Sequence, residues 1–386
     1  MAFDPQAATA HYIDGLGADA LAKAAAYTHG EHWLLLWGLV VSALVTWLIV
    51  RSGVLNRVSG KLQQRGPNLR AFVVAVVVFL ATTLLTLPWT LYESWWREMR
   101  YGRTSQPLTD FLGQGAIGML LTAVLGALFM VGVYALIRRA GRAWWIWSAG
   151  LAAIASTALL LAAPILIEPL FNTFKPVPAG EVRDALVAMA QRAGVPTDRI
   201  FVFDGSRQSN NFTANVAGLA GSARIAISDV AFKGASLDEV KAVTGHEMGH
   251  YVLGHVWRAV GVTAGLAILF FFLADRLFPV MARAFGSSAA LSDPVGLPVL
   301  LFMVSLFGLL AQPALNALSR IDEIEADRYS LETVNLPDAL ASALVKTAEY
   351  RYPRPTPLEE ALFYDHPSVE RRVRTAMDWK ATHDAR

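Results

Sequence analysis

The chain has 386 residues, of which 54% are hydrophobic, and a formal net charge of +2. This composition is too apolar for an ordinary soluble protein and indicates a polytopic membrane protein. The small net charge argues against a nucleic-acid partner. Because the chain has no cysteine, disulfides and thiolate metal ligands are excluded.

Six apolar stretches are long enough to cross a bilayer as helices. Only the fifth carries a charge, Arg258, which lies near its end and can reach the interface. The predicted spans are residues 33–50, 71–91, 111–137, 144–167, 256–274 and 294–319. A further alanine-rich helix is predicted around residues 18–27, but it is too short to span the bilayer.

Residues 168–255 have a different pattern, typical of a small α+β unit. Helical apolar spacing runs from Glu181 to Arg192, and short strands are predicted at 200–203 and 223–228. Ser236 with Glu239 three residues later forms a capping box, so a helix is expected to begin at Leu237. This helix is expected to continue into the fifth span without a break.

The predicted helix carries His-Glu-Met-Gly-His at residues 246–250. His246 and His250 are one turn apart on one helical face, so both imidazoles can reach one zinc ion. Glu247 lies beside them, where it can take a proton from an activated water. The alternative is a helix with two hydrogen-bonded histidines and a surface glutamate.

A zinc site of this kind needs a third protein ligand. The last two predicted spans form a hairpin, which returns the chain to the side of the membrane that carries the histidines. The acidic segment after the second span is therefore delivered back to them. Spacing alone leaves four candidate ligands, which are Asp322, Glu323, Glu325 and Asp327. His255 is expected at the membrane interface rather than on the metal.

These residues together resemble the type-I CaaX prenyl protease family of integral-membrane zinc metalloproteases. That family has a His-Glu-x-x-His helix, two spans and then a Ser-Arg-x-x-Glu-x-x-Ala-Asp motif, which is similar to residues 319–327 here. Further similar segments are Leu87–Tyr92 with Glu98 and Gly102, Glu168–Phe171 with Pro176 and Pro178, and Asp365–Ser368 with Arg372.

The resemblance implies a role for each residue of the site. Glu323 would be the third ligand of one zinc ion, and Asp327 would fix a ligand histidine by a hydrogen bond. His366 would bind the oxyanion or the substrate backbone, and Arg372 would order the acidic residues around the metal. The alternatives are a turn residue for His366 and a surface charge for Arg372.

The resemblance also implies an edge strand that binds substrate by β-augmentation. Where the family has Ser-Asn-Ala-Tyr, this chain has Thr213, Ala214 and Asn215. The family forms a chamber of seven helices, whereas six spans are predicted here.

The expected molecule is mainly α-helical, with about six spanning helices around an internal chamber and a small α+β zinc metalloprotease insertion. Residues 1–168 would form an N-terminal membrane region, and residues 169–386 a metalloprotease domain that includes the last two spans. The expected activity is hydrolysis of membrane-associated or C-terminally lipidated peptides and proteins. The expected location is a bacterial inner membrane, or the endoplasmic reticulum membrane in a eukaryote.

Two other functions are compatible with the metal motif. A membrane quality-control protease of the heat-shock type shares only the metal motifs and lacks the long N-terminal half. A non-catalytic zinc-binding protein or zinc transporter would place acidic or histidine ligands inside its spans, which contain almost none.

The positive charges and the family resemblance predict opposite orientations in the membrane. Lysine and arginine are concentrated in the loops 51–70, 138–143 and 275–293. The positive-inside rule places these loops in the cytoplasm. The resemblance instead implies that the metal site faces the cytoplasm, and this second orientation is the one expected here.

Overall fold

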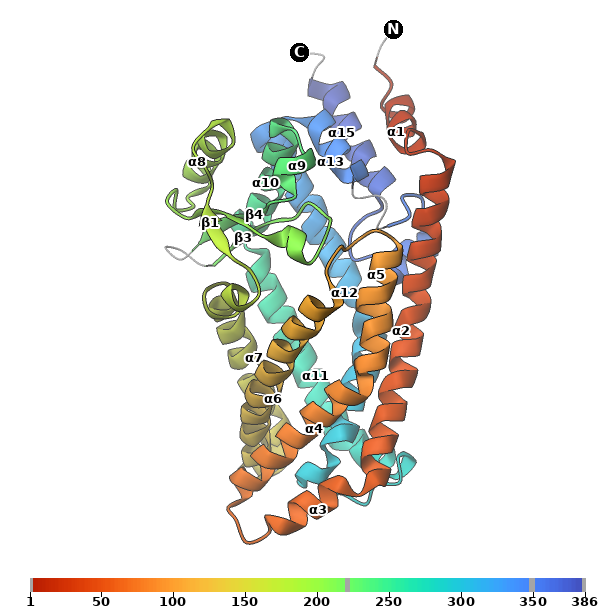
Figure 1. Ribbon diagram of the computed structural model, residues 1–386, viewed down its shortest axis with the longest axis vertical. Helices are drawn as coiled ribbons and strands as arrows, with labels where there is room; N and C mark the ends of the chain where they lie inside the picture. Colours follow the sequence, from red (N-terminus) through yellow and green to blue (C-terminus); the bar gives the residue numbers. More distant parts are fainter. Residues whose placement is uncertain (1–2, 219–222, 347–350, 384–386) are drawn as a thin grey trace.

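The structure is a computed structural model, and it describes residues 3–218, 223–346 and 351–383. The molecule is elongated, and both ends of the chain lie at the same end of its long axis (Figure 1). Within the described residues, six helices are long and apolar enough to cross a membrane, which confirms the predicted number. These candidate spans are Ala18–Ser52, Pro67–Arg100, Leu108–Arg139, Gly141–Leu170, His255–Ala284 and Pro294–Val334.

The core helices of the six spans run along the long axis of the molecule (Figure 1). Two of the spans continue through π-helical turns, at Leu91–Trp96 into α5 (Arg97–Arg100) and at Ala163–Ile167. The main α-helices of the six candidate spans are α2 (Ala18–Ser52), α4 (Pro67–Thr90), α6 (Leu108–Arg139), α7 (Trp144–Ala162), α11 (His255–Ala284) and α12 (Leu297–Val334). Two short helices, α1 (Pro5–Asp14) and α3 (Val54–Lys61), lie at opposite ends (Figure 1).

The prediction of a separate short helix at 18–27 was wrong. Those residues form the first turns of α2, which has 35 residues and is about 52 Å long. No proline separates the alanine-rich segment from the first span, and Gly30 alone does not end a helix. The segment therefore extends the first span toward the metalloprotease unit.

The insertion contains a four-stranded sheet in the order β1-β2-β4-β3. Strands β2 (Ile200–Phe203) and β4 (Arg224–Ser228) are parallel and were predicted. Strand β1 (Phe174–Pro176) pairs with β2 and β3 (Ala214–Ala217) pairs with β4, both antiparallel. The described part of the sheet therefore has β3 at one edge. Helix α8 (Glu181–Ala193) ends at Gly194 as predicted.

Helix α10 (Leu237–Val252) begins at the predicted capping box. The Ser236 hydroxyl accepts from the Glu239 N–H at 3.2 Å, and the Glu239 carboxylate accepts from the Ser236 N–H at 2.7 Å. The expectation of an unbroken helix into the fifth span was wrong, because Gly254 has a φ of 71° and turns the chain between α10 and α11. A left-handed residue ends an α-helix.

The remaining α-helices are shorter. They are α9 (Ala231–Gly234), which packs on β4, α13 (Pro337–Lys346), which packs on α10 and α15, and α14 (Pro357–Phe363) and α15 (Val369–His383), which both pack on α12.

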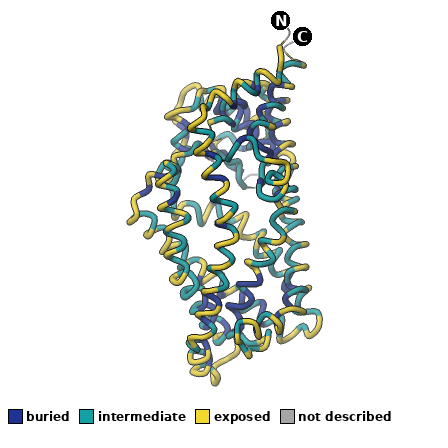
Figure 2. Tube along the Cα trace, turned by 90° about the vertical axis from the view of Figure 1, so that its right-hand side faces the viewer, coloured by how far each residue is buried: buried dark blue, intermediate teal, exposed yellow. Residues whose placement is uncertain are grey.

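Buried residues gather at the two ends of the long axis (Figure 2). One apolar cluster joins the spans near the α3 end, and two others lie beneath the sheet and under α13 and α15. Between the ends, α11 has no buried residue between His255 and Phe271, and α12 has none between Met303 and Asn316. This distribution fits the expected internal chamber, which stays a prediction.

Candidate metal centre

Two helices bring the proposed ligands together. His246 and His250 project from α10, and Glu323 projects from α12. The His246 Nε2 and His250 Nε2 atoms are 3.2 Å apart, and they lie 3.3 and 3.4 Å from the two carboxylate oxygens of Glu323. One ligand atom from each residue lies within 4.8 Å of the other two, so the three side chains can hold one metal ion.

Two glycines of α10 allow this close approach. A β-carbon added at Gly249 would lie 2.9 Å from the Ala326 Cα of α12. One added at Gly245 would lie 2.7 Å from a Val334 methyl carbon. Real side chains do not tolerate such contacts, so the glycines within and just before the histidine motif set the distance between α10 and α12.

The outer nitrogen of His246 is held by a buried ion pair. His246 Nδ1 lies 2.9 Å from Asp327 Oδ1, and Arg372 of α15 contacts both carboxylate oxygens of Asp327 at 2.7 Å. Burial lowers the pKa of His246, but Asp327 and Glu323 outweigh it and raise the pKa to about 10. Because Nδ1 donates to Asp327, the lone pair of a neutral His246 lies on Nε2, toward Glu323.

The buried carboxylate of Glu323 is surrounded by nitrogen atoms. Its Oε2 atom makes no hydrogen bond among the described residues, but it lies 3.3 Å from His246 Nε2 and 3.4 Å from the Arg372 guanidinium, and Oε1 faces His250 and His366. A buried carboxylate needs such compensating groups. Asp322 and Glu325, the other two candidates for the third ligand besides Asp327, are instead ion-paired with Arg258. The structure therefore brings Glu323, and not these two residues, to the histidines.

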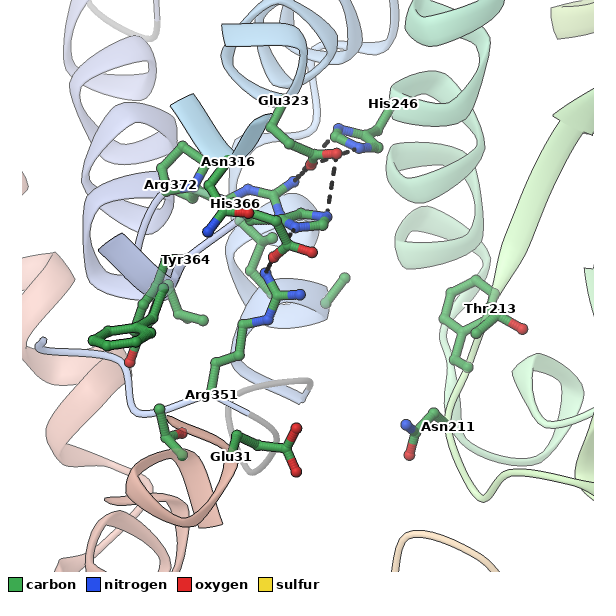
Figure 3. Close-up of a pocket in the computed structure, with 18 of the residues that line it drawn as sticks. Glu31, Asn211, Thr213, His246, Asn316, Glu323, Arg351, Tyr364, His366 and Arg372 are labelled. Carbon is green, nitrogen blue, oxygen red and sulfur yellow. Dashed lines mark hydrogen bonds and ion pairs between the residues drawn. The ribbon is translucent and has the colours of Figure 1, made fainter. Parts of the chain in front are cut away.

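A cavity of about 590 Å³ opens beside His246 and Glu323, and Figure 3 shows part of its lining. Glu247 lines it next to His246, and burial raises the pKa of the Glu247 carboxyl group. A carboxyl group with a raised pKa in such a position can exchange a proton with a water or an amine.

His366 approaches the site from the loop before α15. Its Nε2 lies 3.1 Å from Glu323 Oε1, and its Nδ1 lies 3.0 Å from Asp365 Oδ1. Burial lowers the pKa of His366, but Asp365 and Glu323 together raise it. Because each ring nitrogen faces a carboxylate, the ring can donate a hydrogen bond from Nε2 toward the site.

Thr213 lies across the cavity from the proposed metal ligands (Figure 3). Thr213 and Ala214 line the cavity, whereas Asn215 does not, and the Ala214 methyl group also packs on the core beneath the sheet. Of the three residues expected to bind substrate, Thr213 is therefore the one whose side chain is free to contact it. Strand β3 is an edge strand of the described sheet, so one side of its backbone is not paired with another strand.

Sequence reasoning missed several residues of this site. His255 Nδ1 lies 2.8 Å from His250 Nδ1, so His255 touches a candidate ligand and is 5% exposed. The spacing of five residues between His250 and His255 was the sequence signal that could have indicated this contact. The cavity is also lined from α2 and from the segments around β3 and α14 by Tyr27, Thr28, Glu31, His32, Asn211, Arg351 and Phe363.

Comparisons with known proteins show which family the chain resembles. The model of peptidase family M48 matches residues 176–380, and the model described as the CAAX prenyl protease N-terminal region with five membrane helices matches residues 6–173. The structure has four candidate spans within 6–173 rather than five. The N-terminal match supports the CaaX-type resemblance over the heat-shock alternative.

Curated relatives cover most of the chain. The uncharacterized metalloprotease YhfN of Bacillus subtilis is 26% identical over 92% of this chain and 85% of its own length. A CAAX prenyl protease 1 homolog of Arabidopsis thaliana is 29% identical over 79% of this chain and 72% of its own. The crystal structure of S. mikatae Ste24p has the same fold, with a TM-score of 0.78, 21% identity, and coverage of 95% of this chain and 90% of that one.

Proposed function

Since the chain belongs to peptidase family M48 and is an integral-membrane metalloprotease, we propose that its metal is one zinc ion held by His246, His250 and Glu323. Two imidazoles and one carboxylate are a ligand set of catalytic zinc sites, which leave a further position open. The observation that carries the proposal is the buried Glu323 carboxylate, whose two oxygens lie 3.3 and 3.4 Å from the inner nitrogens of His246 and His250. When bound, zinc supplies a Lewis acid that activates water and polarises the scissile carbonyl group.

The protein residues around the metal would move the protons. Glu247 takes a proton from the attacking water and passes it to the leaving amine, a transfer to which its raised pKa is suited. His366 holds a proton on Nε2, on the cavity side, and donates to the oxyanion that forms on the scissile carbonyl. Asp327 and Arg372 keep His246 oriented.

The substrate would be a peptide segment that binds in extended form along β3. Backbone pairing at a strand edge accepts many sequences, and Thr213 adds one side-chain contact from the wall facing the metal ligands. Because Glu323 lies on the candidate span α12, and the candidate span α11 begins at His255 beside His250, we infer that membrane-associated peptides, including C-terminally lipidated ones, are the substrate class. Relatives named CAAX prenyl protease support this inference.

Purified protein in detergent or vesicles tests the proposal. It should contain one zinc per chain and cleave an internally quenched peptide, and removal of zinc by a chelator should abolish cleavage until zinc is restored. Glu247→Gln should lower kcat by about 10²–10⁴-fold and leave the zinc content unchanged. A protein that binds no zinc, or a Glu247→Gln variant with full activity, would contradict the proposal.

A further inference from the structure

His255 is a buried polar residue that the mechanism above does not use. It is the first residue of α11, and its two ring nitrogens face two different partners. Nδ1 lies 2.8 Å from His250 Nδ1, and Nε2 lies 3.0 Å from Glu325 Oε2. His255 therefore connects one candidate metal ligand to a carboxylate on α12.

The contacts fix the hydrogen positions for neutral rings. Ionised Glu325 can only accept, so His255 Nε2 carries the hydrogen, and in the neutral ring Nδ1 keeps its lone pair. The hydrogen between the two rings then comes from His250 Nδ1. As a result, the lone pair of His250 lies on Nε2, which is the atom that faces His246 and Glu323.

Residues of α11 and α12 hold the far end of this series of hydrogen bonds in place. Arg258 of α11 contacts Glu325 at 3.0 Å and also pairs with Asp322 of α12. His255, Asp322 and Glu325 come close enough together to bind a cation themselves. Because Arg258 already places a positive charge on both carboxylates, the arrangement is a hydrogen-bonded relay and not a second metal site.

We propose that His255 is a positioning residue, which holds His250 in the tautomer and orientation that zinc binding requires. The proposal rests on the proposed function. Each ligand histidine then has its own hydrogen-bonded partner. Asp327, paired with Arg372, contacts His246, and His255 contacts His250. Glu325 and Arg258 in turn hold His255. A partner that fixes the outer nitrogen of a ligand histidine also raises the basicity of the inner one.

Zinc affinity measured by competition with a chromogenic chelator tests this role apart from catalysis. His255→Leu removes the acceptor with a similar volume, and the zinc dissociation constant should rise by about 10–100-fold. His255→Gln keeps both an acceptor and a donor, so its affinity should stay within a few-fold of wild type. Trp257→Phe, an exposed position in the same turn of α11, should bind zinc as wild type does.

Glu325→Leu provides a second test that leaves His255 in place, and it should weaken zinc binding by a smaller factor. The cobalt-substituted proteins should also differ, with a changed visible absorption spectrum in His255→Leu and a nearly native one in His255→Gln. Unchanged zinc affinity and spectrum in folded His255→Leu and Glu325→Leu would overturn the relay. Failure of the wild-type protein to bind zinc would instead overturn the proposed function.

Discussion

At the scale of single residues, the site depends on a buried ion pair from distant parts of the chain. Arg372 of α15 and Asp327 of α12 are almost fully enclosed, with side chains 11% and 4% exposed. Their contact orients His246 of α10, so three helices meet at one hydrogen-bonded group. Burying two charges is costly, but removing only one of them leaves the other without compensation.

Arg372→Met should therefore destabilise the protein by about 3–5 kcal/mol and weaken zinc binding. Arg371 is the matched control, because it neighbours Arg372 in sequence but pairs with Glu360 at the surface and has a side chain that is 62% exposed. Arg371→Met should cost less than about 1 kcal/mol. Chemical unfolding in detergent measures both, and equal losses in the two variants would refute the assigned burial effect.

At the scale of elements, the contact between α10 and α12 sets the geometry of the metal ligands. Gly249 lies against Ala326 and Tyr329, with no room for a side chain. Since the glycine directly precedes His250 and Ala326 follows Glu323 by three residues, any separation of the helices here moves the ligands apart.

Gly249→Ala should force the two helices apart, which costs about 1–3 kcal/mol and lowers both zinc affinity and kcat. Gly261→Ala is the control, because a β-carbon at Gly261 of α11 would meet nothing within 4 Å. Alanine favours helix over glycine by about 1 kcal/mol, so Gly261→Ala should be neutral or stabilising. Thermal unfolding and zinc titration distinguish the two, and a fully active Gly249→Ala would contradict the packing argument.

The start of α10 is fixed by more than its capping box. Glu239 also accepts from Ser342 at 2.6 Å and from Lys346 at 2.7 Å, which ties α10 to α13. Burial raises the pKa of Glu239, but its bonds to Lys346, Ser342 and Ser236 outweigh this effect and hold the pKa below the ordinary value of 4.5. The charged form is therefore the one that stabilises the fold.

Because the folded pKa of Glu239 is depressed, its contribution is complete above about pH 4.5 and is lost as the pH falls through the lower, folded value. Glu239→Gln should destabilise the protein at pH 7 by roughly 1 kcal/mol and by less at pH 3. The unfolding midpoint of both proteins against pH measures this difference. A variant that lost equal stability at both pH values would show that the carboxylate charge is not the cause.

The elements that the sequence predicted correctly are those with a local signal. Apolar length identified the six spans, the capping box located the start of α10, and the histidine motif identified two candidate ligands. Local patterns did not reveal the continuation of α2 to Ala18 or the left-handed break at Gly254, since either conformation is open to those residues. Choosing Glu323 required the hairpin argument and the family resemblance, because four acidic residues have similar spacing.

Long-range packing was not accessible to the same reasoning. Residues of α2 such as Tyr27 and His32 line the cavity although they are more than 200 positions from the metal motif. The sequence predicts His255 at the membrane interface. Its contact with His250 depends on the turn at Gly254, which the sequence pattern does not reveal.

At the scale of the whole molecule, the basic loops and the metal centre lie at opposite ends. The loop around α3 and the connections from α6 to α7 and from α11 to α12 share one end, and the C-terminus lies at the other (Figure 1). The side of the membrane that the metal centre faces therefore also determines the side that the basic loops face.

We expect the metal centre to face the cytoplasm, as the resemblance implies. A reporter fused after Arg386 should then fluoresce if it is green fluorescent protein and be inactive if it is alkaline phosphatase, which needs an oxidising compartment. Fusions within residues 62–66, next to α3, should give the opposite pair of results. The reverse pattern would mean that the positive-inside rule decides the orientation.

The two histidines and the glutamate of the metal centre belong to different kinds of segment. The histidines lie on a helix outside the candidate spans, whereas Glu323 lies on α12, a 38-residue helix that also crosses the hydrophobic region. The catalytic unit is therefore not modular. A water-soluble fragment around the sheet would retain two ligands at most, so a gene encoding the insertion alone could not yield a peptidase, however well that fragment folded.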